Sequence, residues 1–177
     1  MHIQTHFLLS WLVADQGESV SKRDLLIVTL CGVGPDLDGL GLLMDVKTYH
    51  LWHHTVGHSI FTGLLIFICI AFLMKNIRLA TYASLSFYLH LICDFLGSAG
   101  SDGYIWPIYL LWPFSLEKFL NPYQWPLASP INLIVTSVAM LYVMHRASVK
   151  GYSPIILFSK WLDFELVKVF KKWFRKT

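Results

Sequence analysis

SIFTGLLIFICIAFLMKNIRLATYASLSFYLHLICDFLG, residues 59–97, is the stretch that decides the fold. Its first part, residues 59–74, carries no charge, and its second part, residues 79–97, is apolar except for His90 and Asp94. Each part approaches the roughly 20 residues with which a helix crosses a bilayer core about 30 Å thick. Residues 131–144 form a third uncharged run. The sequence therefore predicts three clear membrane spans.

Two further segments extend this pattern toward the N-terminus. Residues 3–14 are apolar but short, and residues 24–44 are long enough but contain Gly34, Pro35, Asp36 and Asp38. Of the 177 residues, 55% are hydrophobic and 14% are charged, against about 25% charged residues in soluble domains. This composition excludes an ordinary soluble monomer and a disordered chain. We expect an all-α, polytopic membrane helical bundle with four to five membrane segments.

The distribution of Lys and Arg predicts an orientation. If the turn at Lys75 and Arg78 faces the cytoplasm, twelve Lys and Arg residues lie inside and only Lys47 and Lys118 lie outside, in agreement with the positive-inside tendency. The C-terminus is then cytoplasmic. Residues 97–130, rich in Gly, Pro, Trp and Tyr, are expected to form an outer-interface loop with short helical pieces and an aromatic belt. A net charge of +3 without a basic stripe does not favour a nucleic-acid partner.

The C-terminal segment has a different character. Residues 155–177 interleave apolar and basic side chains, which predicts a basic amphipathic helix that starts at Ser153-Pro154. Such a helix suits an anionic lipid surface, so membrane lipids are expected partners; packing on a partner protein is the alternative. We therefore divide the chain into a membrane-embedded domain, residues 1–150, and this helix, residues 151–177. The sequence does not indicate which oligomeric state the protein has.

Ionisable groups inside apolar segments are candidates for function, because their burial is costly. Such groups occur in four separate segments, and the predicted topology brings all four to a similar depth on the outer side. His90 and Asp94 share one helix face, and His54 and His58 would do so if their helix began early. The predicted metal ligands are His6, Asp36, Asp38, His53, His54, His58, His90 and Asp94.

The chemistry of this set points to a transition metal. Imidazole combined with carboxylate suits Zn²⁺, with Mn²⁺ or Fe²⁺ as alternatives, and Asp38, His58 and Asp94 are the expected catalytic residues. Each motif alone has a plainer explanation, such as a solvated turn, a hydrogen-bonded histidine or a simple His–Asp pair. His2, His50 and His145 lack such partners in the sequence and are expected at the surface.

The order of these motifs resembles a known family. The motifs are Thr5-His6, Pro35-Asp36-Leu37-Asp38, His53 to Ser59, His90-x-x-x-Asp94 and Trp112-Pro113-Phe114. They are similar to those of the YdjM-like proteins, LexA-binding, inner membrane-associated hydrolases predicted to depend on a metal, over roughly residues 1–145. The resemblance implies a helical protein of a prokaryotic inner or plasma membrane and metal-dependent hydrolysis.

This chain departs from the family pattern at one motif. The family has His-Arg-Gly-x-Thr-His-Ser, whereas here His54 takes the Arg position and Gly57 the Thr position, so either His53 or His54 could be the ligand. The chain is more distantly similar to zinc-dependent phospholipase C enzymes. Those enzymes have further downstream His and Glu ligands, but His145 is the only histidine after Asp94 here. A full trinuclear zinc site is therefore not expected.

The predicted function is a membrane-bound metal-dependent hydrolase that acts on a phosphoester in a lipid or lipid-linked substrate, with a spare Asp or His as general base. The alternative is a non-catalytic membrane protein with a structural or transport-related metal or proton site. A transport pathway predicts ligands at several depths across the bilayer, whereas a hydrolase predicts ligands at one depth. The sequence contains no G-x-S-x-G motif, P-loop or dinucleotide fingerprint.

Overall fold

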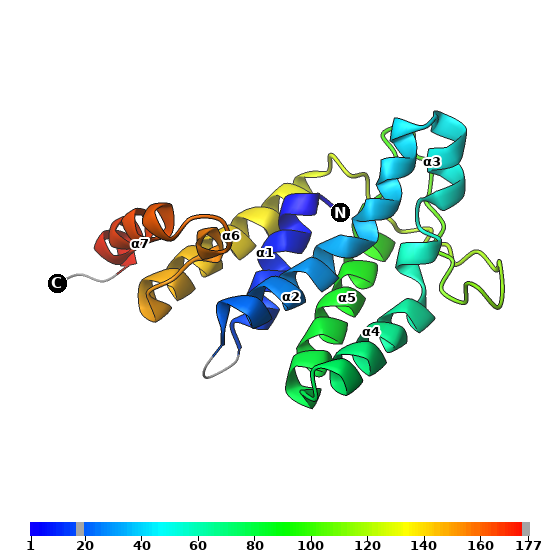
Figure 1. Cartoon of the computed structure of the whole chain (residues 1–177). Coiled ribbons are helices and arrows are strands. Elements are labelled where there is room, and N and C mark those ends of the chain that lie inside the picture. The colour runs from blue at the N-terminus through cyan, green and yellow to red at the C-terminus, as the bar shows by residue number, and fades with distance from the viewer. Residues whose placement is uncertain (17–19, 175–177) are drawn as a thin grey trace.

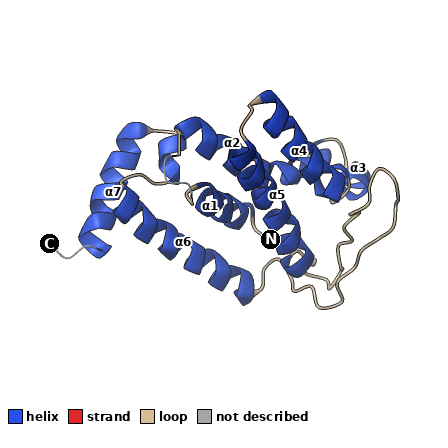
Figure 2. Ribbon diagram, turned by 90° about the horizontal axis from the view of Figure 1, so that it is seen from below, coloured by secondary structure: helices blue, strands red, loops and turns tan. Residues whose placement is uncertain are grey.

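The computed structural model describes residues 1–16 and 20–174, except for the side chains of residues 50 and 51. These residues form helices and loops, with no strand among them (Figures 1 and 2), so the predicted all-α class is confirmed. The helices are α1 (Ile3–Ala14), α2 (Lys22–Val33), α3 (Val46–Trp52), α4 (Ile60–Leu73), α5 (Ile77–Gly97), α6 (Pro130–Lys150) and α7 (Lys160–Phe174). Three 3₁₀ segments join them: η1 (Gly34–Leu43), η2 (Val56–His58) and η3 (Pro154–Leu157).

Three helical segments are long and apolar enough to cross a membrane, and two of them correspond to the predicted spans at residues 79–97 and 131–144. The three segments are Lys22–Leu43, Ile77–Gly97 and Pro130–Lys150. The expected span at residues 59–74 contains only the 14 residues of α4, which extend about 21 Å at 1.5 Å per residue. Conversely, α2 ends at Val33, but Gly34 and Pro35 do not interrupt the helical path, because Pro35 stands at the start of η1 and the chain continues as a tighter helix.

Helix α1 lies at the centre of the bundle and packs against α2, α5 and α6 (Figure 2). Trp11 is completely buried in the apolar core. Thr5 and Thr136 are joined by a hydrogen bond of 2.6 Å, and Arg146 Nε donates to Asp15 Oδ2 at 2.7 Å. Because both pairs are separated by 131 residues, α1 and α6 run parallel and in register.

The two ends of the bundle differ in charge. A cavity lined by Ala14, Asp24, Asn76 and Arg78 shows that the end of α1 meets the starts of α2 and α5. Arg146 reaches the same end through Asp15. Basic residues near these helix ends therefore gather away from the predicted metal ligands. Which side of the membrane this end faces, and the number of crossings, stay predictions.

The outward surfaces of α4 and α6 are strongly apolar. Leu65, Phe72, Ile134 and Val138 each leave more than half of their surface exposed. A soluble monomer rarely exposes contiguous apolar surface on this scale, whereas a lipid environment covers it without cost. These faces agree with a membrane-embedded bundle.

Residues 98–129 contain no helix, although short helical pieces were predicted there. The segment is held by isolated bridges between Ala99 and Pro126 and between Ile108 and Phe119. Asn132 at the start of α6 donates to the carbonyls of Gly97 and Leu127, both at 2.8 Å. Four prolines between residues 107 and 126 remove the backbone donors that a helix requires.

The C-terminal helix starts later than the sequence predicted. Ser153-Pro154 begins η3 instead, and α7 follows only at Lys160. The buried carboxylate of Asp163 accepts hydrogen bonds from the Ser153 backbone N–H at 2.7 Å and hydroxyl at 2.6 Å. One face of α7 packs on α6, while Trp161 and Trp173 stay exposed. Its contact with lipid, and the domain boundary at residue 150, remain predictions.

Candidate metal centre

Helix α5 carries the central pair of the site. His90 and Asp94 lie one turn apart near its C-terminal end, both buried, with His90 Nε2 2.9 Å from Asp94 Oδ2. His90 Nδ1 donates to the carbonyl oxygen of Gly32 on α2 at 2.8 Å. With Nδ1 engaged in this hydrogen bond, Nε2 is the ring nitrogen that faces the carboxylate. Such an orienting hydrogen bond is typical of metal-binding histidines.

The loop before α4 contributes two more buried imidazoles. His58 Nε2 lies 3.3 Å from Asp94 Oδ2 and 3.1 Å from His90 Nε2, and His54 Nε2 lies 4.0 Å from Asp94 Oδ2. His54 and His58 do not share a helix, because α4 begins only at Ile60. Instead, a left-handed backbone at His54, with φ of 64°, turns the chain inward, and the two ring centroids lie 4.5 Å apart.

A close backbone approach fixes this loop against η1. A Cβ atom on Gly57 would lie 2.7 Å from the carbonyl oxygen of Pro35, closer than packed atoms can approach. Glycine at position 57, where the resembling family has threonine, therefore lets the histidine loop pack directly on the Pro35-Asp36 turn.

Asp38 orients the histidines from the side away from Asp94. Its Oδ1 lies 2.8 Å from His53 Nδ1, and its Oδ2 lies 2.9 Å from His58 Nδ1. The same Oδ2 accepts a hydrogen bond of 2.9 Å from the His54 backbone N–H. Because both oxygens are engaged, this geometry is that of a group that orients ligands, and His58 Nε2 is left to face Asp94.

Helix α1 and η1 complete the cluster. His6 Nε2 lies 3.1 Å from Asp94 Oδ1, and the His6 ring stacks on His90 with centroids 3.9 Å apart. Asp36 Oδ1 lies 3.7 Å from His90 Nε2. The amino group of Met1 also contacts Asp94 Oδ1. Asp94 thus presents one oxygen to the α1 side and the other to the histidine loop.

Two ligand sets result, and they share Asp94. The first, set A, is His6, Asp36, His90 and Asp94; the second, set B, is His54, His58 and Asp94. Within each set the ligand atoms lie within 4.8 Å of one another. A carboxylate shared by two sets is the arrangement found in two-metal sites.

The protonation of the loop histidines is set by burial and by the carboxylates. Burial lowers the pKa of His58, but hydrogen bonds to Asp38 and Asp94 outweigh it and raise that pKa to about 9. Burial, reinforced by the neighbouring imidazoles His58 and His53, holds the pKa of His54 well below its usual range. His54 is therefore a neutral imidazole ready to bind a cation, whereas His58 must first release a proton.

The polar atoms of the cluster fit a metal ion. His6 Nδ1, His54 Nδ1 and Asp36 Oδ2 are buried without a hydrogen-bond partner, which is uncommon for buried polar atoms. His58 Nε2, His90 Nε2 and Asp94 Oδ2 converge within 3.3 Å of one another. Such convergence of basic atoms requires a proton or a cation between them. Imidazole and carboxylate donors together suit Zn²⁺, Mn²⁺ or Fe²⁺.

A cavity of about 630 Å³ gives access to the cluster, a volume typical of small-molecule sites. Asp36, His54 and Asp94 form part of its wall, and Trp106 from the 98–129 loop faces them. The ring of Trp106 meets His54 edge-on, with centroids 5.8 Å apart. This end of the bundle is therefore accessible to a ligand.

Comparison with known protein families matches residues 1–169 to the YdjM inner membrane protein family. The chain belongs to this family. No curated protein and no solved structure matches it. The match extends past residue 145, where the sequence resemblance ended, into helix α7.

In this YdjM family member, six of the eight predicted ligands lie in sets A and B. Asp38 and His53 lie outside both sets, so the geometry favours His54 over His53 as the ligand. Of the histidines expected at the surface, His145 is exposed but His2 lines the cavity. The side chain of His50 lies outside the described part of the chain.

Two features of the site could not be predicted from the sequence. The Gly32 carbonyl that orients His90 is a backbone atom and has no motif. Tyr49, which stacks on His53 with centroids 4.7 Å apart, comes from a short helix with no distinctive pattern. The tryptophans of the 98–129 loop were noted as a membrane-interface belt, but Trp106 faces the histidines instead.

Proposed function

We propose that this protein is a membrane-bound metal-dependent hydrolase that cleaves a phosphoester in a lipid or lipid-linked substrate. The observation that carries the proposal is the shared carboxylate of Asp94, which joins two ligand sets beside an accessible cavity. Divalent metal ions held there would supply Lewis-acid activation of water and of a phosphoryl oxygen. Zn²⁺ is the first candidate, with Mn²⁺ and Fe²⁺ as alternatives.

The side chains of the cluster divide the remaining tasks. Sets A and B would hold the cations, while Asp38 and the Gly32 carbonyl fix the orientation of the rings. Asp36 lines the cavity, and its buried Oδ2 has no hydrogen-bond partner. This oxygen is the general base that we favour, because Oδ1 faces set A while Oδ2 stays free to accept a proton from an attacking water.

A transport pathway is less well supported. Proton or metal relays through a membrane place ionisable groups at successive depths. Here the candidate ligands gather at one end of the bundle, and the other buried carboxylate near α1, Asp15, is paired with Arg146. A metal that only stabilises the fold would have the same ligand sets, and activity distinguishes it.

The test is to purify the chain in detergent, quantify bound metal and assay phosphomonoester and phosphodiester turnover with and without chelator. We expect stoichiometric transition metal, and turnover that is lost with chelator and restored by metal. Asp94→Asn should lose both metal and turnover, whereas His145→Gln, which removes an exposed histidine outside the cluster, should retain both. Absence of stoichiometric metal refutes the proposal, and metal without turnover favours the structural role.

A further inference from the structure

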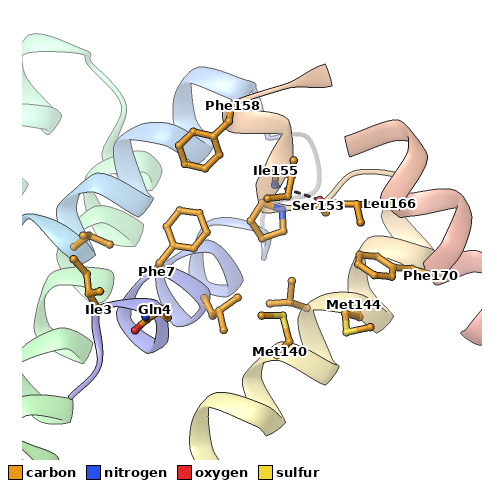
Figure 3. Close-up of a pocket in the computed structure, with 14 residues that line it drawn as sticks. Ile3, Gln4, Phe7, Met140, Met144, Ser153, Ile155, Phe158, Leu166 and Phe170 are labelled. Atoms are coloured by element: carbon orange, nitrogen blue, oxygen red, sulfur yellow. Dashed lines mark hydrogen bonds between the residues drawn. The ribbon is translucent and has the colours of Figure 1, made fainter. Parts of the chain in front are cut away.

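A second large cavity, distinct in character from the first, lies along α1. It has a volume of about 570 Å³ and is lined by 14 residues from α1, α2, α6, η3 and α7. Only Gln4 and Ser153 among them carry polar side chains. Figure 3 shows Ile3 and Gln4 at one side of this apolar groove, and Leu166 and Phe170 at the opposite side.

The apolar groove adjoins the cavity of the metal centre. Ile3 and Gln4 line both spaces, and they precede His6 by less than one helical turn. Because α1 and α6 run in register from the Thr5–Thr136 pair, Met144 lies eight residues, or about 12 Å, farther along the bundle. The groove therefore extends from beside the metal centre toward the basic end.

Helix α7 forms the far wall. The carboxylate of Asp163 accepts both hydrogen bonds from Ser153, which fastens α7 to η3. This contact keeps Leu166 and Phe170 against the groove. A polar, histidine-lined cavity at one end and an apolar wall formed by α7 at the other match a molecule with a phosphate head and one long hydrocarbon chain.

We propose that the apolar groove binds the hydrocarbon chain of the substrate, and that the enzyme acts on long-chain alkyl phosphate monoesters. The inference rests on the proposed function. Hydrolysis forms a bond from a water oxygen to phosphorus and breaks the phosphorus–oxygen bond to the chain. One water proton passes to the leaving alkoxide, so that the products are a long-chain alcohol and inorganic phosphate. The groove takes no part in these steps and only positions the phosphate.

Two adjacent positions on α6 give a matched test. Met140 lines the groove, whereas Leu141, similarly exposed, lies outside its lining. In the metal-loaded full chain, Met140→Trp should lower kcat/KM for hexadecyl phosphate about tenfold, equivalent to 1.4 kcal/mol. It should leave butyl phosphate within twofold and bound metal unchanged. Leu141→Trp should alter neither substrate. Equal loss on both substrates with Met140→Trp, or no loss on either, overturns the proposal.

A binding experiment separates this proposal from the hydrolase proposal. Hexadecyl phosphate with a photoreactive group in mid-chain should label Met140, Met144 and Ile155, and excess hexadecyl phosphate, but not butyl phosphate, should compete. Labelling spread equally over Leu141 and the exposed face of α4 means that the groove holds bulk lipid, which overturns the inference. If the wild-type chain hydrolyses neither phosphate, the hydrolase proposal fails, and the labelling pattern still decides whether the groove binds the chain.

Discussion

Asp38→Asn tests the architecture of the site most directly. The Asp38 carboxylate accepts three hydrogen bonds, from His53 Nδ1 at 2.8 Å, from His58 Nδ1 at 2.9 Å and from the His54 backbone N–H at 2.9 Å. Asparagine preserves the shape but offers only one acceptor oxygen, and its amide group would confront one of these donors. At least one of the three hydrogen bonds is lost, and a neutral amide oxygen, which is a weaker acceptor than a carboxylate, holds the His58 ring less firmly with Nε2 toward Asp94.

The expected magnitude follows from the role of Asp38. Loss of a carboxylate that orients a metal-binding histidine typically weakens metal affinity about 10- to 100-fold, or about 1.4–2.8 kcal/mol. Zinc titration of the metal-free protein against a competing chelator measures this change. Asp45→Asn is the control, because Asp45 is exposed and caps α3 through Thr48, and asparagine caps a helix equally well.

The reasoning fails if Asp38→Asn binds zinc within threefold of wild type while His58→Ala binds it far more weakly. Such a result would mean that His58 is a ligand whose orientation does not depend on Asp38. Circular dichroism and the thermal midpoint in detergent show whether the variant keeps its fold. A variant with unchanged helix content and a changed zinc affinity isolates the orienting role.

Three further predictions concern protons, metal number and stability. The pKa of His58 is raised to about 9, and metal binding displaces its proton. Zinc affinity should therefore rise about tenfold per pH unit from pH 7 and level off near pH 9. A zinc affinity that does not change with pH contradicts this prediction. Asp94→Asn should abolish metal binding, whereas Asp36→Asn, which affects set A alone, should leave one metal per chain by elemental analysis. Arg146→Met leaves the buried carboxylate of Asp15 without its cation and should lower the free energy of unfolding by about 3 kcal/mol. Lys168→Met, which breaks an exposed ion pair with Glu165, should lower it by less than about 1 kcal/mol. Unfolding of the two variants in detergent measures both changes.

Hydropathy predicted the helices well, because apolar runs and their charged ends are local properties. It misjudged which segments are long enough to cross a membrane, because that depends on whether a break in the pattern ends a helix. At Gly34-Pro35 the chain tightens into η1 and continues. At Ser59 the hydroxyl caps α4 by accepting from the Phe61 N–H at 3.1 Å, and the helix starts no earlier.

The cluster itself could be predicted in outline, since an i, i+4 pair on a helix and segments at equal depth need only topology. The role of each side chain within the cluster could not be predicted. The roles of Asp36 and Asp38 differ, although they are two residues apart, because successive side chains of a 3₁₀ segment point in different directions. Asp36 faces His90, whereas Asp38 faces His53 and His58. No property of a Pro-Asp-x-Asp motif distinguishes them.

A comparison of two buried carboxylates gives the physical reason for a cation at Asp94. Asp15 is fully buried, and its charge is balanced by the permanently charged guanidinium of Arg146 and by the Tyr152 hydroxyl at 2.6 Å. Asp94 is equally buried, but, apart from the Met1 amino group, its charged contacts in the described residues are imidazoles. Imidazoles balance a carboxylate only when they bind a proton or a metal ion. The rings of His54, His58 and His90 stand within 4.0 Å of one oxygen of Asp94. If all three were protonated, the carboxylate charge would be balanced, but three buried imidazolium cations would repel one another. A divalent ion shared among them neutralises the carboxylate and leaves the rings uncharged.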